Sequence, residues 1–217
     1  MKTDSQLQQD VLAELEWEPS VNAAHIGVEV RDGVVTLAGH VDSYAEKWGA
    51  ENAAQRVAGV KAMAIEMHVK LPGASERTDA DIAKTATSAI EWLTTVPQGA
   101  VQVKVEHGRV SLTGEVDWAY QRWSAETSIR CLFGVTDVVN HILLKRRESS
   151  HRVVKSDIEA ALKRRALADA KRVSVEVRDS VVTLSGEVPY WSDRELARMS
   201  AWSAPGVRDV VDKMTVR

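Results

Sequence analysis

Hydrophobic and polar residues follow a fixed order along this chain. Between residues 7 and 15 the apolar residues recur every four positions behind polar ones, which predicts a helix with a candidate cap in front of it. From 26 to 37 apolar residues alternate with polar ones on both sides of an Arg-Asp-Gly turn, which indicates a β-hairpin. A second helix is expected at about 43–58, because a glycine follows it, and a third strand at 63–69. The predicted order is therefore helix, strand, strand, helix, strand.

This order occurs three times, at offsets of 75 and 72 residues. The segment 33–41 (Gly-Val-Val-Thr-Leu-Ala-Gly-His-Val) returns as 108–116 (Gly-Arg-Val-Ser-Leu-Thr-Gly-Glu-Val) and as 180–188 (Ser-Val-Val-Thr-Leu-Ser-Gly-Glu-Val). A repeat of this length indicates one structural unit used three times. The predicted domains are 1–72, 76–146 and 149–217, and the predicted polar linkers are 72–75 and 148–150. Each domain is expected to be α+β, with a small mixed three-stranded sheet covered on one face by two helices.

Two positions of the repeat are always glycine. The first lies where the second strand leaves the sheet, and the second follows helix two. The six residues are Gly39, Gly114 and Gly186 at the first position, and Gly59, Gly134 and Gly206 at the second. We interpret the first set as a bend without room for a Cβ atom rather than as an anion-binding nest, and the second as left-handed helix caps.

The repeated motif also resembles a known family. It consists of a turn glycine, then Val-x-Leu-x-Gly-x-Val, then an alanine-bearing helix that ends in Gly-Val before a final strand. This pattern resembles the BON domain, named for bacterial osmotic-stress and nodulation proteins, and the resemblance covers nearly the whole chain. It implies a small α/β sandwich, attachment to phospholipid membranes or other envelope interfaces, a stress-protective role and no known catalytic chemistry. The third unit departs from the motif, because Ser180 replaces the turn glycine.

Helix two carries large aromatic residues on the side away from its own sheet. With Ala50 on the buried stripe, Trp48 lies about 160° around the helix. The outward aromatic residues are Tyr44, Trp48, Trp123, Trp191 and Trp202, and one outward repeat position is always basic, as Lys47, Arg122 and Arg194. At the end of helix one, by contrast, Trp17 and Trp92 are expected to cap the core, and their counterpart is Arg164.

The outward aromatic residues allow two interpretations, because monomers seldom expose contiguous apolar patches. In the first, helix two of one unit packs on a neighbouring unit, since units of about 70 residues bury too little surface alone. In the second, this helix face docks on a membrane or a protein partner, with the indoles at headgroup level and the basic residues beside them.

Charge is graded along the chain, although the whole chain carries only −3. Residues 1–74 have 6 basic and 11 acidic side chains, 75–148 have 9 and 10, and 149–217 have 13 and 10. The densest basic run is Lys163, Arg164 and Arg165. It is either a solvated helix end or a weak, salt-sensitive contact with anionic lipid. Opposite charges on the first and third units also favour association of units or of chains, so a homo-oligomer is an open alternative.

Candidate catalytic and metal-binding patterns are lacking in the sequence. The six histidines have no ligand spacing, Cys131 is the single cysteine, and no nucleophile elbow or phosphate-binding loop occurs. We therefore expect no enzyme, no metal and no cofactor. Nucleic acid is not expected as a partner, because the net charge is negative and no RNA-binding motif occurs.

The location of the protein is also an expectation from the sequence. The first ten residues lack the apolar region of a signal peptide, and no apolar run reaches the length of a membrane span. The chain as written is expected to be cytoplasmic, whereas the family resemblance implies export to the periplasm for many members. The hypothesis is thus a peripheral protein on anionic phospholipid in osmotic or envelope stress, with a protein-interaction scaffold or homo-oligomer as the alternative.

Overall fold

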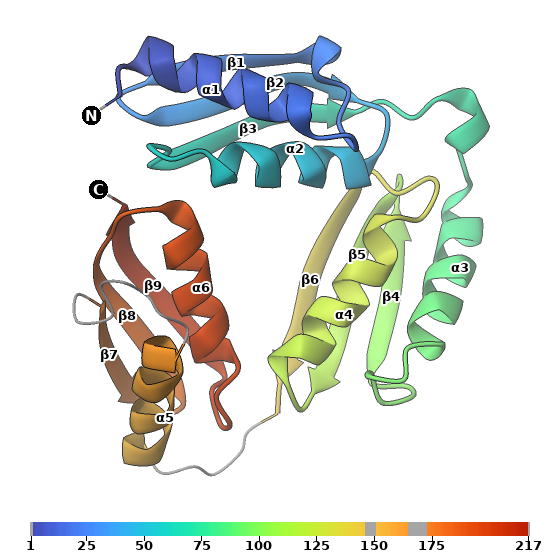
Figure 1. Ribbon diagram of the computed structural model, residues 1–217. Coiled ribbons are helices and arrows are strands. Elements are labelled where there is room, and N and C mark those ends of the chain that lie inside the picture. Colours follow the sequence, from blue (N-terminus) through green and yellow to red (C-terminus); the bar gives the residue numbers. More distant parts are fainter. Residues whose placement is uncertain (1, 146–150, 165–172, 217) are drawn as a thin grey trace.

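The computed structural model describes residues 2–145, 151–164 and 173–216, without the side chains of 151–153 and 162–164. Within them the chain forms three α+β units of the predicted element order (Figure 1). Unit 1 contains α1 (Asp4–Trp17), β1 (Ile26–Arg31), β2 (Val34–Val41), α2 (Tyr44–Arg56) and β3 (Ala62–Val69). Unit 2 contains α3 (Asp79–Glu91), β4 (Val101–Glu106), β5 (Arg109–Val116), α4 (Ala119–Arg130) and β6 (Asp137–Leu144). Unit 3 contains α5 (His151–Arg164), β7 (Val173–Arg178), β8 (Val181–Val188), α6 (Trp191–Trp202) and β9 (Asp209–Val216).

Each unit has a mixed sheet with the second strand in the middle. In unit 1, β1 and β2 are antiparallel, with Val28 opposite Leu37, and β2 and β3 are parallel, with Leu37 beside Ile65. Leu37 is fully buried, and both helices of the unit contact this sheet. Ala50 on α2 is also fully buried, so a small side chain lets this helix approach the strands closely. The sheets of units 2 and 3 repeat the same pairing.

The linkers differ in how far they are described. The first contains a short 3₁₀ turn at Gly73–Ser75 rather than an irregular polar stretch. The second, 148–150, lies outside the described residues.

A carboxylate at the start of helix one holds the hairpin turn in two of the units. In unit 2, the Asp79 carboxylate accepts hydrogen bonds from the backbone N–H groups of His107 (2.8 Å) and Gly108 (2.9 Å). These backbone hydrogen bonds lower the pKa of the Asp79 carboxyl, because they stabilise its charged form. Asp4 holds the turn of unit 1 in the same way, while the equivalent residue in unit 3 is His151.

The first set of glycines does not lie where the second strand leaves the sheet, as predicted, but two residues before the end of that strand, next to the start of the first strand. Two of them lie against backbone. Gly39 has a φ of 131°, and a Cβ atom there would lie 2.0 Å from the carbonyl oxygen of His25. Gly114 has a φ of 133° and the same 2.0 Å approach to the carbonyl oxygen of Ala100. Only glycine fits both the conformation and the space. Gly186 shares this conformation with a φ of 124°, and the glycines after helix two also have positive φ, at Gly59, Gly134 and Gly206.

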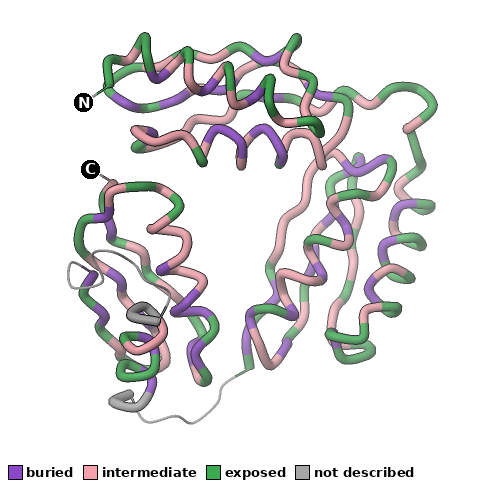
Figure 2. The backbone as a smooth tube through the Cα atoms, viewed as in Figure 1, coloured by how far each residue is buried: buried purple, intermediate pink, exposed green. Residues whose placement is uncertain are grey.

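The three units lie around a common centre, with α2 of unit 1 and α6 of unit 3 on the inner side and α3 of unit 2 at the outer edge (Figure 1). Figure 2 shows that buried residues line the faces where helices and sheets meet in each unit. The two chain ends lie on the same side of the molecule, because unit 3 returns to unit 1 (Figure 1).

The clefts between the units show that unit 2 is placed against unit 1 in the same way as unit 3 is placed against unit 2. The cleft between units 1 and 2 and the cleft between units 2 and 3 are lined by the same positions of the repeat. These are Lys47, His68, His107 and Asp137 in the first cleft, and Arg122, Leu143, Asp179 and Asp209 in the second. A further cleft brings Tyr190 of unit 3 to Gly33 of unit 1. Unit 3 therefore follows unit 2 in the way that unit 2 follows unit 1, and because unit 3 also contacts unit 1, the three units form a closed ring.

Candidate functional site

The ring is held by three joints between the second helices. In each joint the first half of helix two from one unit meets the second half of helix two from the next. Joint 1–2 links α2 to α4, joint 2–3 links α4 to α6, and joint 3–1 links α6 to α2. The outward aromatic residues predicted from the sequence lie at or near these joints.

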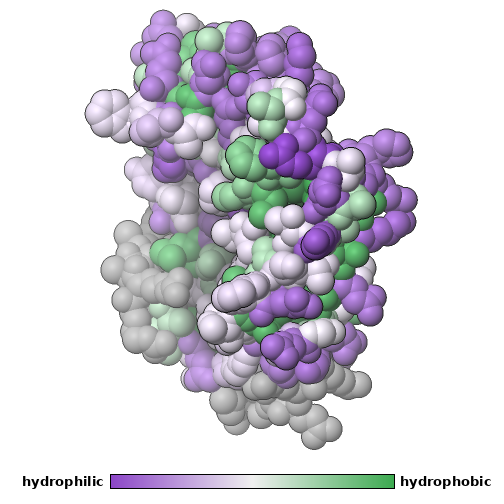
Figure 3. Space-filling view, turned by 90° about the vertical axis from the view of Figure 1, so that its right-hand side faces the viewer, coloured by the Kyte–Doolittle hydropathy of each residue, from purple (hydrophilic) through white to green (hydrophobic). Residues whose placement is uncertain are grey.

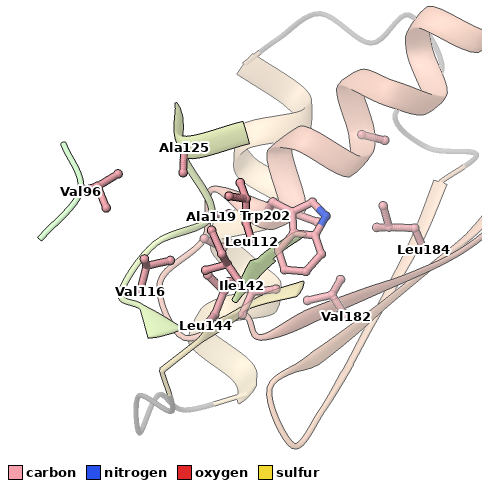
Figure 4. Close-up of a cluster of buried hydrophobic side chains, with 14 of the residues drawn as sticks. Val96, Leu112, Val116, Ala119, Ala125, Ile142, Leu144, Val182, Leu184 and Trp202 are labelled. Atoms are coloured by element: carbon pink, nitrogen blue, oxygen red, sulfur yellow. The ribbon is translucent and has the colours of Figure 1, made fainter. Parts of the chain in front are cut away.

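Joint 2–3 is built on Trp202 at the end of α6. Its side chain is only 8% exposed and belongs to a hydrophobic cluster that is continuous between units 2 and 3. Other members of this cluster, drawn with it in Figure 4, are Leu112, Ile142, Val182 and Leu184. The guanidinium carbon of Arg122 lies 5.2 Å from the centroid of the Trp202 ring, and Trp123 is partly buried against the same cluster.

Joint 1–2 combines a cation–π contact with partly buried ionisable groups. The guanidinium carbon of Arg130 lies 4.6 Å from the centroid of the Trp48 ring, and Tyr44 packs against the cluster shared by units 2 and 3. Burial raises the pKa of the Tyr44 hydroxyl, and the negative charge of Asp137 raises it further. Burial also raises the pKa of the Glu51 carboxyl. Forming joint 1–2 therefore removes water from Tyr44 and Glu51, which costs free energy, as well as gaining contacts.

Joint 3–1 closes the ring through Trp191 at the start of α6. Its side chain is partly buried and packs against the hydrophobic core of unit 1. Arg194 lies over the same ring, with its guanidinium carbon 5.1 Å from the centroid. A groove remains beside this contact, between α2 and α6.

The shared basic position lies along the joints rather than on one outer face. Lys47 and Arg122 line equivalent clefts between units. Arg194 is largely buried and forms an ion pair with Asp212, with 2.7 Å between Nε and Oδ2. The side chains of the predicted basic run, Lys163, Arg164 and Arg165, lie outside the described part of the chain.

Two exposed tryptophans at the ends of the first helices overturn one sequence prediction. Trp17 is 81% exposed and Trp92 is 86% exposed, so the prediction that they cap the core is wrong. Each follows a core residue, Leu15 or Ile90, by two positions, which turns its side chain about 200° away from the core. A helical wheel of helix one, drawn from the sequence, places both tryptophans on the side away from the core. We call Trp17 and Trp92 the rim tryptophans.

Register brings together three histidines that are far apart in the sequence. His40 lies beside His68 on the neighbouring strand, and the imidazoles of His25 and His40 are stacked with 4.5 Å between ring centroids. Spacing along the chain could not reveal this row, because His25 lies in the 3₁₀ turn before β1 and the other two lie on β2 and β3. Among the described residues, no group of three or more His, Cys, Asp or Glu side chains is arranged to hold a metal ion.

Other exposed hydrophobic residues are scattered. Phe133, Leu143 and Tyr120 of unit 2 are 66%, 58% and 50% exposed. Figure 3 shows hydrophilic side chains over most of unit 1 and hydrophobic residues below it that are interrupted by hydrophilic ones. In the part of the chain that the structure describes, no helix has the length and apolar character needed to cross a bilayer.

Comparisons with solved structures give weak likenesses. CdsD, a structural protein of the Type III secretion system of Chlamydia trachomatis, is 13% identical, with 97% of this chain and 92% of that chain covered and a TM-score of 0.27. The periplasmic domain of PrgH is 14% identical, with 96% and 99% covered and a TM-score of 0.24. TM-scores this low support no argument about function.

Comparisons of sequence are more specific. Osmotically-inducible protein Y of Escherichia coli strain K12 is 31% identical over 146 residues, which is 65% of this chain and 73% of that protein. The BON domain family matches residues 3–70, 78–146 and 151–217, one match in each unit. The chain therefore belongs to the BON domain family and contains three BON domains in tandem.

Proposed function

We propose that this protein acts without catalysis in the osmotic-stress response, by docking peripherally on a phospholipid surface through the rim tryptophans. The observation that carries the proposal is that Trp17 and Trp92, at one repeat position, are 81% and 86% exposed. An indole has an apolar body and a polar N–H group, so it is most stable at the boundary between acyl chains and headgroups. The stress role rests on the osmotically inducible relative in Escherichia coli.

The repeat supports a contact by more than one unit. Trp17 and Trp92 hold the same repeat position at the ends of the first helices, so units 1 and 2 each present an exposed indole. The third equivalent residue is Arg164, which ends α5 and belongs to the basic run predicted from the sequence.

The division of charge supports a mixed attachment. Unit 1 is acidic and contributes an indole, while the segment 149–217 carries 13 basic against 10 acidic residues. Basic residues near an anionic membrane contribute about 1 kcal/mol each, and this contribution falls with salt. The free energy of docking is thus expected to have a salt-independent contribution from the rim tryptophans and a salt-sensitive contribution from the basic residues of unit 3.

Two aromatic residues of helix two are covered in the closed ring, whereas Trp48 is 43% exposed, about half the exposure of the rim tryptophans. Trp202 is buried between units 2 and 3, and Trp191 packs on unit 1. A membrane could reach them only after a joint had opened. The rim tryptophans need no such opening, which favours them as the docking residues.

Vesicle co-sedimentation tests the proposal. We expect the intact protein to sediment with vesicles that contain phosphatidylglycerol, and the double variant Trp17→Ala/Trp92→Ala to lose most of this binding with an unchanged melting temperature. Tyr120→Ala removes another half-exposed aromatic residue and serves as the matched control, with binding unchanged. Binding by the double variant equal to that of the intact protein would refute docking through the rim tryptophans. An intact protein that ignores vesicles but forms concentration-dependent oligomers would support the scaffold alternative instead.

A further inference from the structure

Joint 3–1 is packed less completely than joint 2–3, although both use the same repeat positions. In joint 2–3 these positions are held by Ala119 and Trp202, which are 4% and 8% exposed. In joint 3–1 they are held by Trp191 and Gln55, which both stay partly exposed. The shorter Gln55 thus stands where the indole of Trp202 lies in the other joint.

The space left at joint 3–1 is a groove of about 560 Å³, within the range of about 300–1,000 Å³ that is usual for ligand sites. The indoles of Trp48 and Trp191 line it from different units, and α2 contributes small residues to its floor. Further lining residues are Ala45, Gly49, Asn52 and Cys131. Its surface is therefore largely apolar and aromatic.

The charged groups at the edge of the groove are already paired within the protein. Arg56 and Glu18 form an ion pair with 2.8 Å between Nη2 and Oε2. Glu195 is paired with Arg198, with 2.9 Å between Nη1 and Oε2. An ionic ligand would have to displace one of these pairs, whereas an uncharged ligand leaves both in place.

We infer that this groove is a binding site for a small, uncharged, planar aromatic molecule about the size of indole. The ring itself supplies the precedent, since joint 2–3 buries an indole at the equivalent position. Stacking or edge contacts with two tryptophans favour a flat aromatic ring over an aliphatic chain of similar size. The site lies at the closure of the ring, so an occupant would also bridge units 3 and 1. The inference is independent of the rim tryptophans and of membrane docking.

Indole serves as the probe on the full chain. We expect saturable binding by calorimetry, with a dissociation constant of about 1 mM or tighter. Cys131 provides a second readout, because it is exposed, lines the groove and is the single cysteine of the chain. Indole is expected to slow the alkylation of Cys131 by iodoacetamide with the same concentration dependence.

Variants locate the binding. Gln55→Trp places an indole at the groove position equivalent to Trp202 and is expected to weaken indole binding at least about tenfold. Trp191→Ala removes one wall and is expected to weaken it as well, and it gives a second reading if Gln55→Trp does not fold. Thr127→Trp, at an exposed position of α4 outside the groove, is the matched control with unchanged binding. No saturable binding to the intact protein, or binding that both groove variants retain, would overturn the inference.

Discussion

Replacing Trp202 with alanine tests whether the second helices hold the ring together. A tryptophan side chain buries about 150–250 Å² when it is enclosed, and Trp202 is 8% exposed. At about 25 cal/mol per Å², the lost burial alone corresponds to about 4–6 kcal/mol. Truncation of buried aromatic residues costs about 3–5 kcal/mol in practice, which agrees with this estimate. The ring of Trp202 also loses its contact with Arg122, which adds about 0.5–2 kcal/mol.

Denaturant unfolding, followed by circular dichroism and by tryptophan emission, measures this loss. We expect Trp202→Ala to lower the free energy of unfolding of unit 3 by about 4 kcal/mol and to separate its transition from that of unit 2. Trp92→Ala is the matched control, because it removes the same side chain from a position that is 86% exposed, and it is expected to change stability by less than about 0.5 kcal/mol. Equal stability of the Trp202→Ala variant and the control would refute the packing assigned to joint 2–3.

Three further substitutions test individual features of the units. Gly39→Ala is expected to lower the free energy of unfolding by at least about 2 kcal/mol, because the new Cβ would lie 2.0 Å from the His25 carbonyl oxygen. Gly73→Ala, where the new Cβ would lie in open space, is the control and should change the thermal or chemical unfolding little. The carboxyl pKa of Asp79 is lowered, so its hydrogen bonds stabilise the fold above the unfolded pKa of about 4. Asp79→Asn should therefore destabilise the protein at pH 7, and the stability difference between the variant and the intact protein should shrink as the pH falls below about 4. Burial raises the pKa of the Glu51 carboxyl, so its charged form destabilises the folded protein. Glu51→Gln should therefore raise the free energy of unfolding at pH 7, and a pH series should show that this increase disappears below about pH 4.

Local structure could be predicted from the sequence because each unit repeats the same simple signals. Alternating residues defined the hairpins, and the apolar stripe of helix one is buried in unit 1 at Leu7, Val11 and Leu15. The outward direction of Trp202 from its own sheet also followed from helical periodicity. Helical periodicity could not show what covers the Trp202 side chain, because it describes one element at a time and the covering residues belong to a different unit.

The candidate site was harder to predict for the same reason. From the sequence, Trp17 is expected to cap the core, although its offset from Leu15 places it on the solvent side of the helix. The row formed by His25, His40 and His68 depends on strand register, which no spacing in the sequence expresses. The groove beside Trp191 exists only because the chain closes into a ring.

Ring closure is tested most directly by small-angle X-ray scattering of the intact chain at low concentration. Three units that pack around one centre give a radius of gyration of about 17 Å for 217 residues. Three units strung on their linkers, without contact between unit 3 and unit 1, give about 25 Å or more. A value near the smaller figure, independent of protein concentration, is the expected result. A value near the larger one would contradict the closed ring and the joints on which it depends.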